Sequence, residues 1–461
     1  MDRQEKFDKL IAKYPHPQKN FYQREHLTRR TFFNIAGAGL TASYLASKLP
    51  AGQLITSTNV KMINKAKKVI FILLAGAPSH TDTFDLKMIP GVTPASFAPA
   101  TINGGLFPAG LMPKLAGQMS DIAIVRSMRA WALVHSLGQT WTQIGRNPAA
   151  VLGNISPNIG SVVAIEKQSE RTASQIFPTF LALNSNGGVG GGYMPAVYAP
   201  FKITPSTAGI KNTSNSDGQA RFNQRWSLLH HLDDPLRIDS PDGKAMSDYD
   251  EFYSAAQGMM YNPVVSKAFT FTTADSVRYG STGFGNACLV AKQVIASGQG
   301  TRYVQITQGG WDMHQNIYAA NTLPTMAKLL DDGLSALIGD LKASGDFADT
   351  MIVMVGEFGR TTGPVSAAGG RDHYAQQFAF FAGAGIKGKI VGSTDSLGRA
   401  TVDPGWSRAR DVKPEDVEAT IYSAMGINWT SVRHDDPLGR GFYYVPSSDQ
   451  DLYGPINELW D

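Results

Sequence analysis

The sequence predicts an α/β fold in which a mostly parallel central sheet carries helices on both faces. Two apolar runs, residues 69–74 and 351–355, have the length of strands and contain no polar residue. Continuous runs of this kind are typical of strands that are buried on both faces of a parallel sheet. A helical repeat of leucines over residues 322–341 leads into the second run. Because strands alternate with helices along the chain, parallel pairing is favoured.

Further apolar segments complete the predicted sheet and its helices. Additional strands are expected at residues 122–125, 303–306, 378–381 and 389–391. The spacing of apolar residues predicts additional helices at residues 131–146, 287–297 and 414–425. Open α/β sheets hold their ligands beyond the carboxyl ends of the strands, so the polar residues that follow these strands are the candidates for a functional site.

The length and composition of the chain favour one large folded unit. The chain has 461 residues, of which 43% are hydrophobic, and this is enough for a sizeable core. Length alone would allow about three domains, but α/β folds often exceed 250 residues as one unit. We therefore expect a leader and linker at residues 1–67 and one domain at residues 68–461. The single cysteine, Cys288, excludes an intrachain disulfide and a zinc–thiolate cluster.

Positive charge is concentrated in the leader. Residues 1–67 contain 12 Lys or Arg and 4 Asp or Glu, whereas the whole chain contains 42 and 38. The remainder of the chain therefore has 30 basic and 34 acidic residues, and its net charge is slightly negative. Because the basic balance comes from the leader alone, no binding surface for nucleic acid is expected on the folded part.

The leader contains a paired-arginine motif. Arg29 and Arg30 stand shortly before Phe32-Phe33 and an uncharged stretch at residues 35–47 that is rich in small residues. This pattern resembles a twin-arginine signal, which implies recognition by the twin-arginine translocation machinery and a periplasmic or extracellular location. An amphipathic helix with two surface arginines is the alternative. The stretch is shorter than the about 20 apolar residues that span a bilayer, but a retained leader would anchor the protein to a membrane.

Four glycine-containing motifs occur in order along the chain. They are G-A-P-S-H-T-D-T-F-D at 76–85, G-G-W-D-M-H-Q-N at 309–316, G-E-F-G-R-T at 356–361 and G-G-R-D-H at 369–373. In this order and separation they resemble the DUF1501 family of exported bacterial proteins, which is related to the alkaline phosphatase and sulfatase superfamily. The resemblance implies an alkaline-phosphatase-like α/β fold and a metal-dependent hydrolase of phosphate or sulfate esters.

The resemblance does not supply a nucleophile. Counting back from the triplet at residues 144–146 places His135 where sulfatases carry a modified cysteine. Ser136 or Thr140 could take the role of nucleophile, but a hydroxyl near the start of a helix is commonly a cap or a surface residue. The chain also departs from the sulfatase pattern at Ala75-Gly76 and Glu357-Phe358, which stand in place of strand-end aspartates and of an Asp-His pair.

A loop-rich insertion is expected at residues 184–270. Glycines, prolines and asparagines are frequent there, and amphipathic helices are predicted at residues 221–233 and 248–260. A glycine-rich run can hold phosphate when a helix starts directly after it, but Tyr193-Met-Pro195 provides no helix start. We expect the insertion to cover the site or to contact a protein partner.

Carboxylates and imidazoles follow several predicted strands, and converging groups of this kind suit a divalent metal. The expected metal is Zn, Mn, Ca or Mg, and the substrate is a small-molecule or glycan ester. Arg360 and Arg371 are expected to hold its anionic group. The predicted metal ligands are Asp82, Asp312, His314, Glu357, Asp372 and His373, with Asp85 and His135 nearby in the sequence pattern.

One alternative to the metal-dependent hydrolase remains open at this point. The same side chains can form an internal network of ion pairs that ties loops together, with His373 as a structural histidine. The protein would then be a non-catalytic exported binding or assembly protein that keeps the hydrolase fold.

Overall fold

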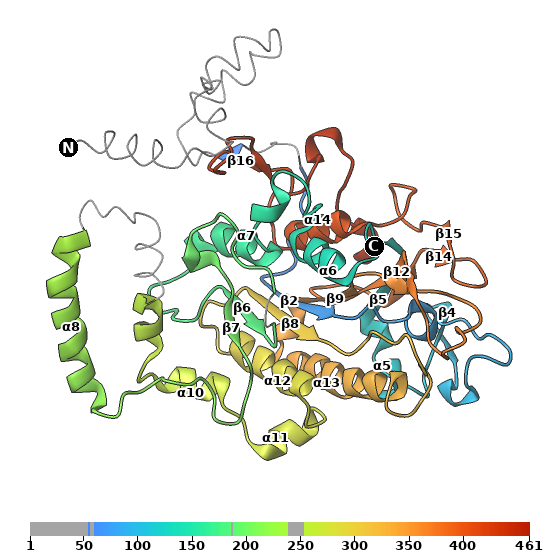
Figure 1. Ribbon diagram of the computed structural model, residues 1–461, viewed down its shortest axis with the longest axis horizontal. Coiled ribbons are helices and arrows are strands. Elements are labelled where there is room, and N and C mark those ends of the chain that lie inside the picture. Colours follow the sequence, from blue (N-terminus) through green and yellow to red (C-terminus); the bar gives the residue numbers. More distant parts are fainter. Residues whose placement is uncertain (1–53, 56–59, 186–187, 238–252) are drawn as a thin grey trace, which may run out of the picture.

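The computed structural model describes residues 54–55, 60–185, 188–237 and 253–461. An eight-stranded sheet forms its centre, with the strand order β13-β5-β12-β9-β2-β8-β6-β7 (Figure 1). In this order the strands are Lys389–Val391, Ile122–Arg129, Gln376–Gly383, Thr350–Gly356, Lys68–Leu74, Tyr303–Gln308, Phe180–Leu183 and Phe201–Ile203. Every predicted strand is therefore present, with ends that differ by up to four residues.

Strand pairing confirms the mostly parallel sheet. β2 pairs in parallel with both β8 and β9, and β6 pairs in parallel with β7 and β8. β12 alone runs antiparallel to its two neighbours, β5 and β9. β9 lies in the interior of the sheet between β2 and β12, and all seven of its residues are buried. This burial on both faces explains its continuous apolar sequence.

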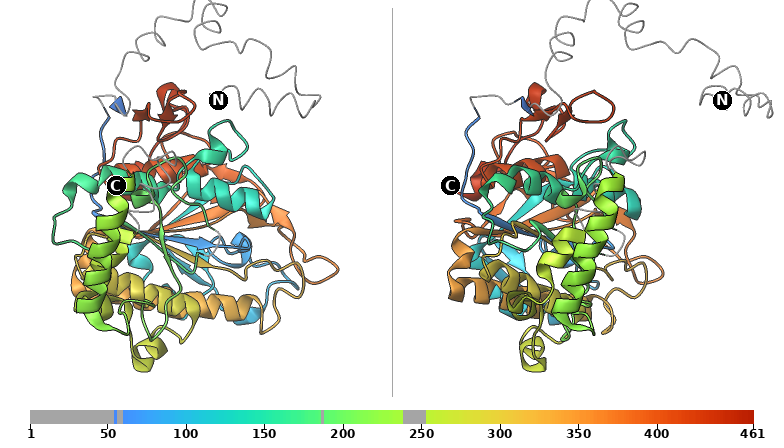
Figure 2. Two further views of the ribbon diagram at one scale, coloured as in Figure 1. Left: turned by 60° about the vertical axis from the view of Figure 1, so that its left-hand side comes forward. Right: turned by 90° about the vertical axis from the view of Figure 1, so that its left-hand side faces the viewer.

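Helices cover both faces of the sheet, as the sequence predicts. In Figure 1, α12 (Gly283–Ala296) and α13 (Leu323–Ser344) lie below the sheet, whereas α6 (His135–Ile144), α7 (Ile159–Glu166) and α14 (Pro414–Ala424) lie above it. The views in Figure 2 show the same three layers. The strands therefore supply apolar side chains to two separate cores.

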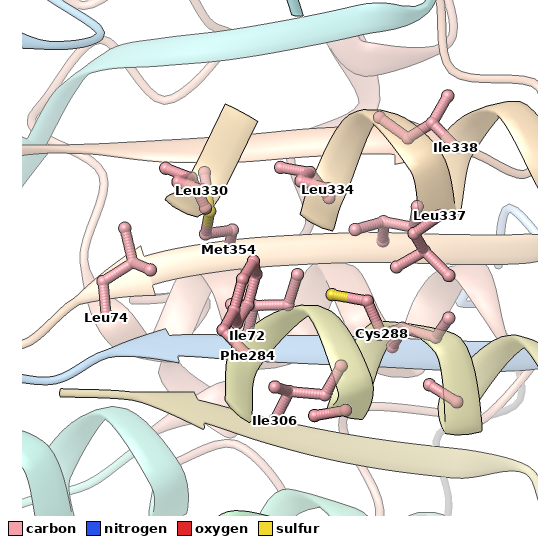
Figure 3. Packing of buried hydrophobic residues seen from close by; sticks show 14 of the residues in the cluster. Ile72, Leu74, Phe284, Cys288, Ile306, Leu330, Leu334, Leu337, Ile338 and Met354 are labelled. Carbon is pink, nitrogen blue, oxygen red and sulfur yellow. The ribbon is translucent and has the colours of Figure 1, made fainter. Parts of the chain in front are cut away.

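Alternate residues of each strand face the two cores. Ile72 of β2 packs with Cys288 of α12 and Leu334 of α13 in the lower core (Figure 3). Its neighbours Phe71 and Leu73 belong to the upper core instead. Because both sets are almost fully buried, a register shift of one residue would exchange the two faces, so the packing fixes the register.

Three of the differences between predicted and observed helix boundaries have local reasons. α6 begins at His135 and not at residue 131, because Val134 has an extended backbone (φ −117°, ψ 125°). α12 begins at Gly283, where the side chain of Thr282 accepts a hydrogen bond from the backbone N–H of Gly285. α13 continues to Ser344 and ends at Gly345, which has the left-handed conformation that commonly terminates helices.

The predicted insertion contributes an edge strand and several helices. Within residues 184–270, β7 pairs with β6 at one edge of the sheet, and α8 (Gly218–Arg237) lies on the outer flank (Figure 1). None of the described side chains of α8 is buried. A further helix covers residues 253–259, and the part of its predicted range at 248–252 lies outside the described residues. The division of the chain into leader, domain and insertion stays a prediction.

The remaining elements are short and lie around this framework. Their helices are α5 (Pro113–Ala116), α10 (Pro263–Phe269) and α11 (Thr273–Arg278). Their strands are β1 (Leu54–Ile55), β3 (Ala100–Ile102), β4 (Gly105–Phe107), β10 (Gly359–Arg360), β11 (His373–Tyr374), β14 (Ser393–Thr394), β15 (Thr401–Asp403), β16 (Val432–Arg433) and β17 (Phe442–Tyr443). The paired arginines of the leader lie outside the described residues. Among the described helices, none has the length and hydropathy of a membrane span.

Candidate metal centre

Four side chains from distant parts of the chain converge beyond the carboxyl ends of the parallel strands. They are His135, Asp312, His314 and His373, and one ligand atom from each lies within 4.8 Å of all the others. His135 is the first residue of α6, Asp312 and His314 follow β8, and His373 begins β11. This group could hold a metal ion, and it lies where open α/β sheets place their sites.

Two glycines allow the loops of the centre to approach one another. A Cβ atom on Gly76 would lie 2.6 Å from the backbone nitrogen of Asp312, and the φ of Gly76 is +107°. A Cβ atom on Gly370 would lie 2.0 Å from the carbonyl carbon of His314. A side chain at either position would therefore push away the loop that carries two of the four residues.

Hydrogen bonds orient two of the three imidazoles. Nδ1 of His373 lies 2.7 Å from the carbonyl oxygen of Leu133, which only accepts, so this nitrogen donates. Nδ1 of His135 lies 2.7 Å from Oε1 of Glu357 and donates to that carboxylate. In both rings the proton is thereby assigned to Nδ1, and the lone pair of Nε2 is left for the centre. Metal-binding histidines usually have this arrangement.

The third imidazole is held more loosely. Nε2 of His314 lies 2.9 Å from Oδ1 of Asp312 and 3.1 Å from Nε2 of His373. Its Nδ1 lies 3.7 Å from a carboxylate oxygen of Asp372, which is beyond hydrogen-bonding distance. The side chains of His314 and Asp312 are 43% and 48% exposed, so the centre opens to solvent on this side.

An unsatisfied nitrogen in the centre fits a metal ion. Nε2 of His135 is buried and has no hydrogen-bond partner, and Oδ1 of Asp312 lies 3.4 Å from it. Buried polar atoms are nearly always hydrogen-bonded, so an orphan that faces other ligand atoms calls for an explanation. Three imidazole nitrogens and one carboxylate oxygen form a donor set that zinc and other first-row metals accept.

Glu357 lies behind the centre and not among the converging four. Its side chain is buried, and Oε1 accepts hydrogen bonds from His135, from the backbone N–H of Gly76 at 2.9 Å and from Gln139 at 3.0 Å. Its other oxygen, Oε2, is buried without a hydrogen-bond partner. Glu357 was predicted as a ligand, and the structure brings it to the centre through His135.

Arg360 contacts the centre with a guanidinium whose nitrogens all donate hydrogen bonds. It donates to Oδ1 of Asp312 at 2.5 Å and to Nε2 of His314 at 3.2 Å. Its other N–H groups donate to the carbonyl oxygens of Gly76, Ala77 and Arg371. Burial alone would raise the pKa of Asp312, but hydrogen bonding and the charge of Arg360 outweigh this effect, so the pKa is lowered. The carboxylate is therefore anionic at neutral pH.

Asp82 and Arg371 form a separate buried ion pair. Nε of Arg371 donates to Oδ2 of Asp82 at 2.6 Å, and both side chains are almost completely buried. Tyr318 donates to Asp82 and accepts from Arg371 at 2.8 and 2.9 Å. The remaining N–H groups of Arg371 donate to the carbonyl oxygens of Thr361 and Gly363. The structure thus places both residues in a loop-bracing network and not in the converging group.

The other predicted residues also lie outside the group of four. Asp85 is buried and pairs with Lys87 and Arg126. Asp372 is 75% exposed beside His314. Ser136 is exposed at the start of α6, and Thr140 donates its hydroxyl to the backbone carbonyl of Ser136. The nucleophilic roles considered for Ser136 and Thr140 have no structural counterpart among these contacts.

Sequence reasoning missed the supporting residues of the centre. Gln139 and the Leu133 carbonyl bind Glu357 and His373, respectively, and neither was a candidate. A signal for Gln139 was present, because it follows His135 by four residues on a predicted helix and so shares its face. A contact made by a backbone carbonyl, such as that of Leu133, cannot be predicted from residue type, because every residue has this carbonyl.

The chain is similar to several solved structures at low sequence identity. Solved structures that are similar to the chain include the PsFucS1 sulfatase from Pseudoalteromonas sp., at 11% identity, with 78% of this chain and 68% of that chain covered and a TM-score of 0.38. An alkaline phosphatase superfamily protein from Vibrio parahaemolyticus matches at 10% identity, over 85% and 74% of the two chains, with a TM-score of 0.37. At these TM-scores the similarities contribute no argument about function.

A third solved structure is also similar to the chain, and a family model matches most of its length. The lipoteichoic acid synthase LtaP from Listeria monocytogenes matches at 11% identity, over 81% and 76% of the two chains, with a TM-score of 0.35. No curated protein matches the sequence. The family model described as "Protein of unknown function (DUF1501)" matches residues 66–442, which is most of the chain. The predicted relationship is confirmed, and the chain belongs to the DUF1501 family.

Proposed function

We propose that the protein is a metal-dependent hydrolase of phosphate or sulfate esters, with His135, Asp312, His314 and His373 as the metal ligands. The observation that supports the proposal most is the convergence of three imidazole nitrogens and one carboxylate oxygen in a solvent-open site. Nitrogen donors in the majority favour zinc over calcium or magnesium, and manganese is kept as the second candidate. A bound divalent ion would polarise the ester and stabilise charge on the leaving oxygen.

The residues of the chain would prepare this site in distinct ways. Glu357 and the Leu133 carbonyl would hold the rings of His135 and His373 with their Nε2 lone pairs toward the ion. Arg360 would keep Asp312 ionised and fixed in position. Because Ser136 is exposed at the start of α6 and the hydroxyl of Thr140 donates to a backbone carbonyl, we propose water as the attacking group, so that water cleaves the ester into an alcohol and a free phosphate or sulfate.

An activity assay on matched histidine variants tests the proposal. We expect the purified chain, loaded with zinc or manganese, to hydrolyse 4-nitrophenyl phosphate, bis(4-nitrophenyl) phosphate or 4-nitrophenyl sulfate. His314→Ala should abolish this activity, whereas His230→Ala, on α8 outside the centre, should leave it unchanged. Absence of activity on all three esters in the metal-loaded chain would argue against the hydrolase.

A second candidate function is binding or assembly without catalysis. α8 in the insertion exposes Leu228, Leu229 and Leu232 by 58, 48 and 60%. A helix with no buried side chain among residues 218–234 is more typical of a segment that meets a partner. Under this function the centre would be a network of hydrogen bonds and ion pairs only. A chain that takes up no metal, together with lost partner capture when the three leucines are replaced by serine, would favour it.

The location of the activity is a separate part of the proposal. The paired arginines Arg29 and Arg30 support export by the twin-arginine route, and the reaction would then occur in the periplasm or outside the cell. Replacing both arginines by lysine should retain the protein in the cytoplasm. Undiminished export of that double variant would remove this part of the proposal and leave the hydrolase untouched.

A further inference from the structure

A groove lies beside α6, the helix that begins at His135 of the candidate metal centre. The groove has a volume of about 640 Å³ and lies between α6, residues 146–153 that follow it and residues 440–453. Its polar and aromatic lining includes Trp131, Trp141, Arg146, Glu415, Arg440 and Tyr453. α6 belongs to both sites, because His135 is its first residue and Trp141 lies six residues further, about 9 Å along the helix axis. Trp131, which also lines the groove, stands two residues before Leu133, whose carbonyl accepts a hydrogen bond from His373 of the centre.

A buried carboxylate fixes the two tryptophans of the groove. Oε2 of Glu415 accepts a hydrogen bond from the indole N–H of Trp131 at 3.0 Å, and Oε1 accepts one from Trp141 at 2.9 Å. The two rings are stacked, with centroids 6.2 Å apart and an angle of 26° between them. Each indole is thus held by stacking of its ring and by the hydrogen bond of its N–H. Together the two tryptophans form a fixed aromatic surface in the groove.

The unfavourable burial of the Glu415 carboxylate indicates that this pair of tryptophans has a functional role. Glu415 is only 3% exposed, and burial raises its pKa to about 7 even though the two indoles donate to it. Burying a carboxylate is unfavourable, so a fold gains little by using one to orient a surface side chain. Trp131 is nevertheless 48% exposed. An exposed indole that is held by a buried acid is better explained as part of a preorganised binding surface.

The charges around the groove favour an anionic ligand. Arg440 and Arg146 line it, but the guanidinium of Arg146 is buried and donates to backbone carbonyls, so Arg440 supplies the exposed charge. Glu415, whose oxygens already accept from the indoles, is the only acidic residue of this lining. Arg440 is exposed, and the structure shows no hydrogen bond or ion pair of its guanidinium within the described residues. Lys413 adds a further positive charge, with Nζ 4.1 Å from the centroid of the Trp131 ring. A negatively charged ligand would complement this set.

We propose that this groove binds sugar rings of an anionic polysaccharide, and that the ester group next to the metal centre belongs to the same polymer. A sugar ring has an apolar C–H face that packs on an indole and hydroxyl edges that meet polar groups such as Asn147 and Ser447, which also line the groove. Its sulfate or phosphate groups would pair with Arg440. The assignment of the ester to this polymer rests on the proposed function, whereas binding in the groove does not.

Binding measurements on metal-free protein test the proposal without catalysis. Isothermal titration calorimetry of the full chain after EDTA treatment would compare dextran sulfate, neutral dextran and poly(vinyl sulfonate), which carries charge without sugar rings. Dextran sulfate should bind most tightly. Trp131→Ala should weaken its binding by about tenfold or more and Arg440→Gln by several-fold, as expected for an aromatic anchor and an exposed charge. Trp226→Ala, on α8 outside the groove, is the matched control and should bind as the unchanged chain does.

The outcomes separate this proposal from the hydrolase. His314→Ala should bind dextran sulfate normally while losing hydrolysis, so failure of the hydrolase alone leaves the groove supported. Equal binding of dextran sulfate and poly(vinyl sulfonate) would show a response to charge only and would overturn the proposal. Unchanged dextran sulfate binding in both Trp131→Ala and Arg440→Gln would also overturn it. Because Arg440 lies on the surface, its variant remains informative if Trp131→Ala does not fold.

Discussion

Nδ1 of His135 lies 2.7 Å from Oε1 of Glu357, although 222 positions separate the two residues in the sequence. This bond connects the start of α6 to the loop after β9 and turns the Nε2 of His135 toward Asp312. The buried Glu357 is in turn held by the backbone of Gly76 after β2. Three segments that follow or face the carboxyl ends of the strands are thus joined at one carboxylate.

The first prediction concerns this carboxylate. Glu357→Gln should lower the affinity for zinc or manganese by about 10–100-fold, because an amide orients the His135 ring less strongly and makes its nitrogen a weaker ligand. Isothermal titration calorimetry measures the affinity. Glu170→Gln is the control, because Glu170 is exposed and pairs with Lys167 outside the group of converging residues. An unchanged affinity in Glu357→Gln would mean that His135 is not a ligand oriented by Glu357.

The second prediction concerns the approach of two loops at Gly76. Gly76→Ala should destabilise the protein by more than about 1 kcal/mol, because the left-handed backbone disfavours a side chain and the added Cβ meets the backbone of Asp312. Metal affinity should fall as well, since the loop of Asp312 and His314 must move. Gly309→Ala is the matched control, because a Cβ there meets no atom within 4 Å. Urea unfolding gives the stability, and equal effects of the two substitutions would contradict the close-packing argument.

The third prediction separates the buried ion pair from the metal centre. Asp82→Asn should destabilise the chain by about 3–5 kcal/mol, because the buried charge of Arg371 loses its partner. Asp451→Asn, which removes the 82%-exposed partner of Arg408, should cost less than about 1 kcal/mol. Metal content of the folded Asp82→Asn protein should be unchanged. A protein that keeps its stability but loses its metal would instead make Asp82 a ligand, as the sequence predicted.

The fourth prediction is a pH dependence that arises at Glu418. Burial raises the pKa of Glu418 to about 8, although the charge of Arg146 and the hydroxyl of Tyr422 favour its ionised form. Between the unfolded pKa near 4.5 and the folded value, the folded state binds more protons than the unfolded state. The contribution of this group to stability is therefore present at pH 4–5 and is lost as the pH rises toward 8.

Glu418→Gln tests this dependence, because a glutamine stays neutral at every pH and its carbonyl can still accept from Tyr422. The variant should gain stability relative to the unchanged chain as the pH rises from 5 to 8 in urea unfolding experiments. A constant difference between the two proteins across this range would show that Glu418 does not titrate with a raised pKa.

Much of the fold could be predicted from the sequence, because strands that are buried on both faces have continuous apolar sequences. Residues 69–74 and 351–355 were predicted as central strands and pair directly as β2 and β9. Their apolar sequences are unambiguous because both faces of the sheet are covered. β6 and β7 were not predicted. β6 is fully buried but has only four residues, and such a short apolar run does not by itself distinguish a strand from a buried helix segment. β7, Phe201–Ile203, is a half-exposed edge strand within a proline-rich segment and lacks any apolar run. The sequence pattern fails where a strand is short or its burial is partial.

The site was only partly readable for a related reason. Sequence position after a strand indicated Asp312, His314 and His373, and these three do converge. The same position also indicated Asp82 and Asp372, yet one is buried against Arg371 and the other is turned to solvent. The direction in which a side chain points after the end of a strand depends on the backbone conformation of the loop, such as the positive φ of Gly76. Residue type alone does not determine this direction.

The metal content of the purified chain tests the central claim most directly. The protein would be equilibrated with zinc or manganese, passed through a desalting column and analysed for bound metal, with folding checked by circular dichroism. We predict a single tightly bound ion per chain, its loss in His314→Ala and in His373→Ala, and its retention in His230→Ala. A folded chain without stoichiometric metal, or His314→Ala and His373→Ala variants that keep the full metal content, would contradict the account.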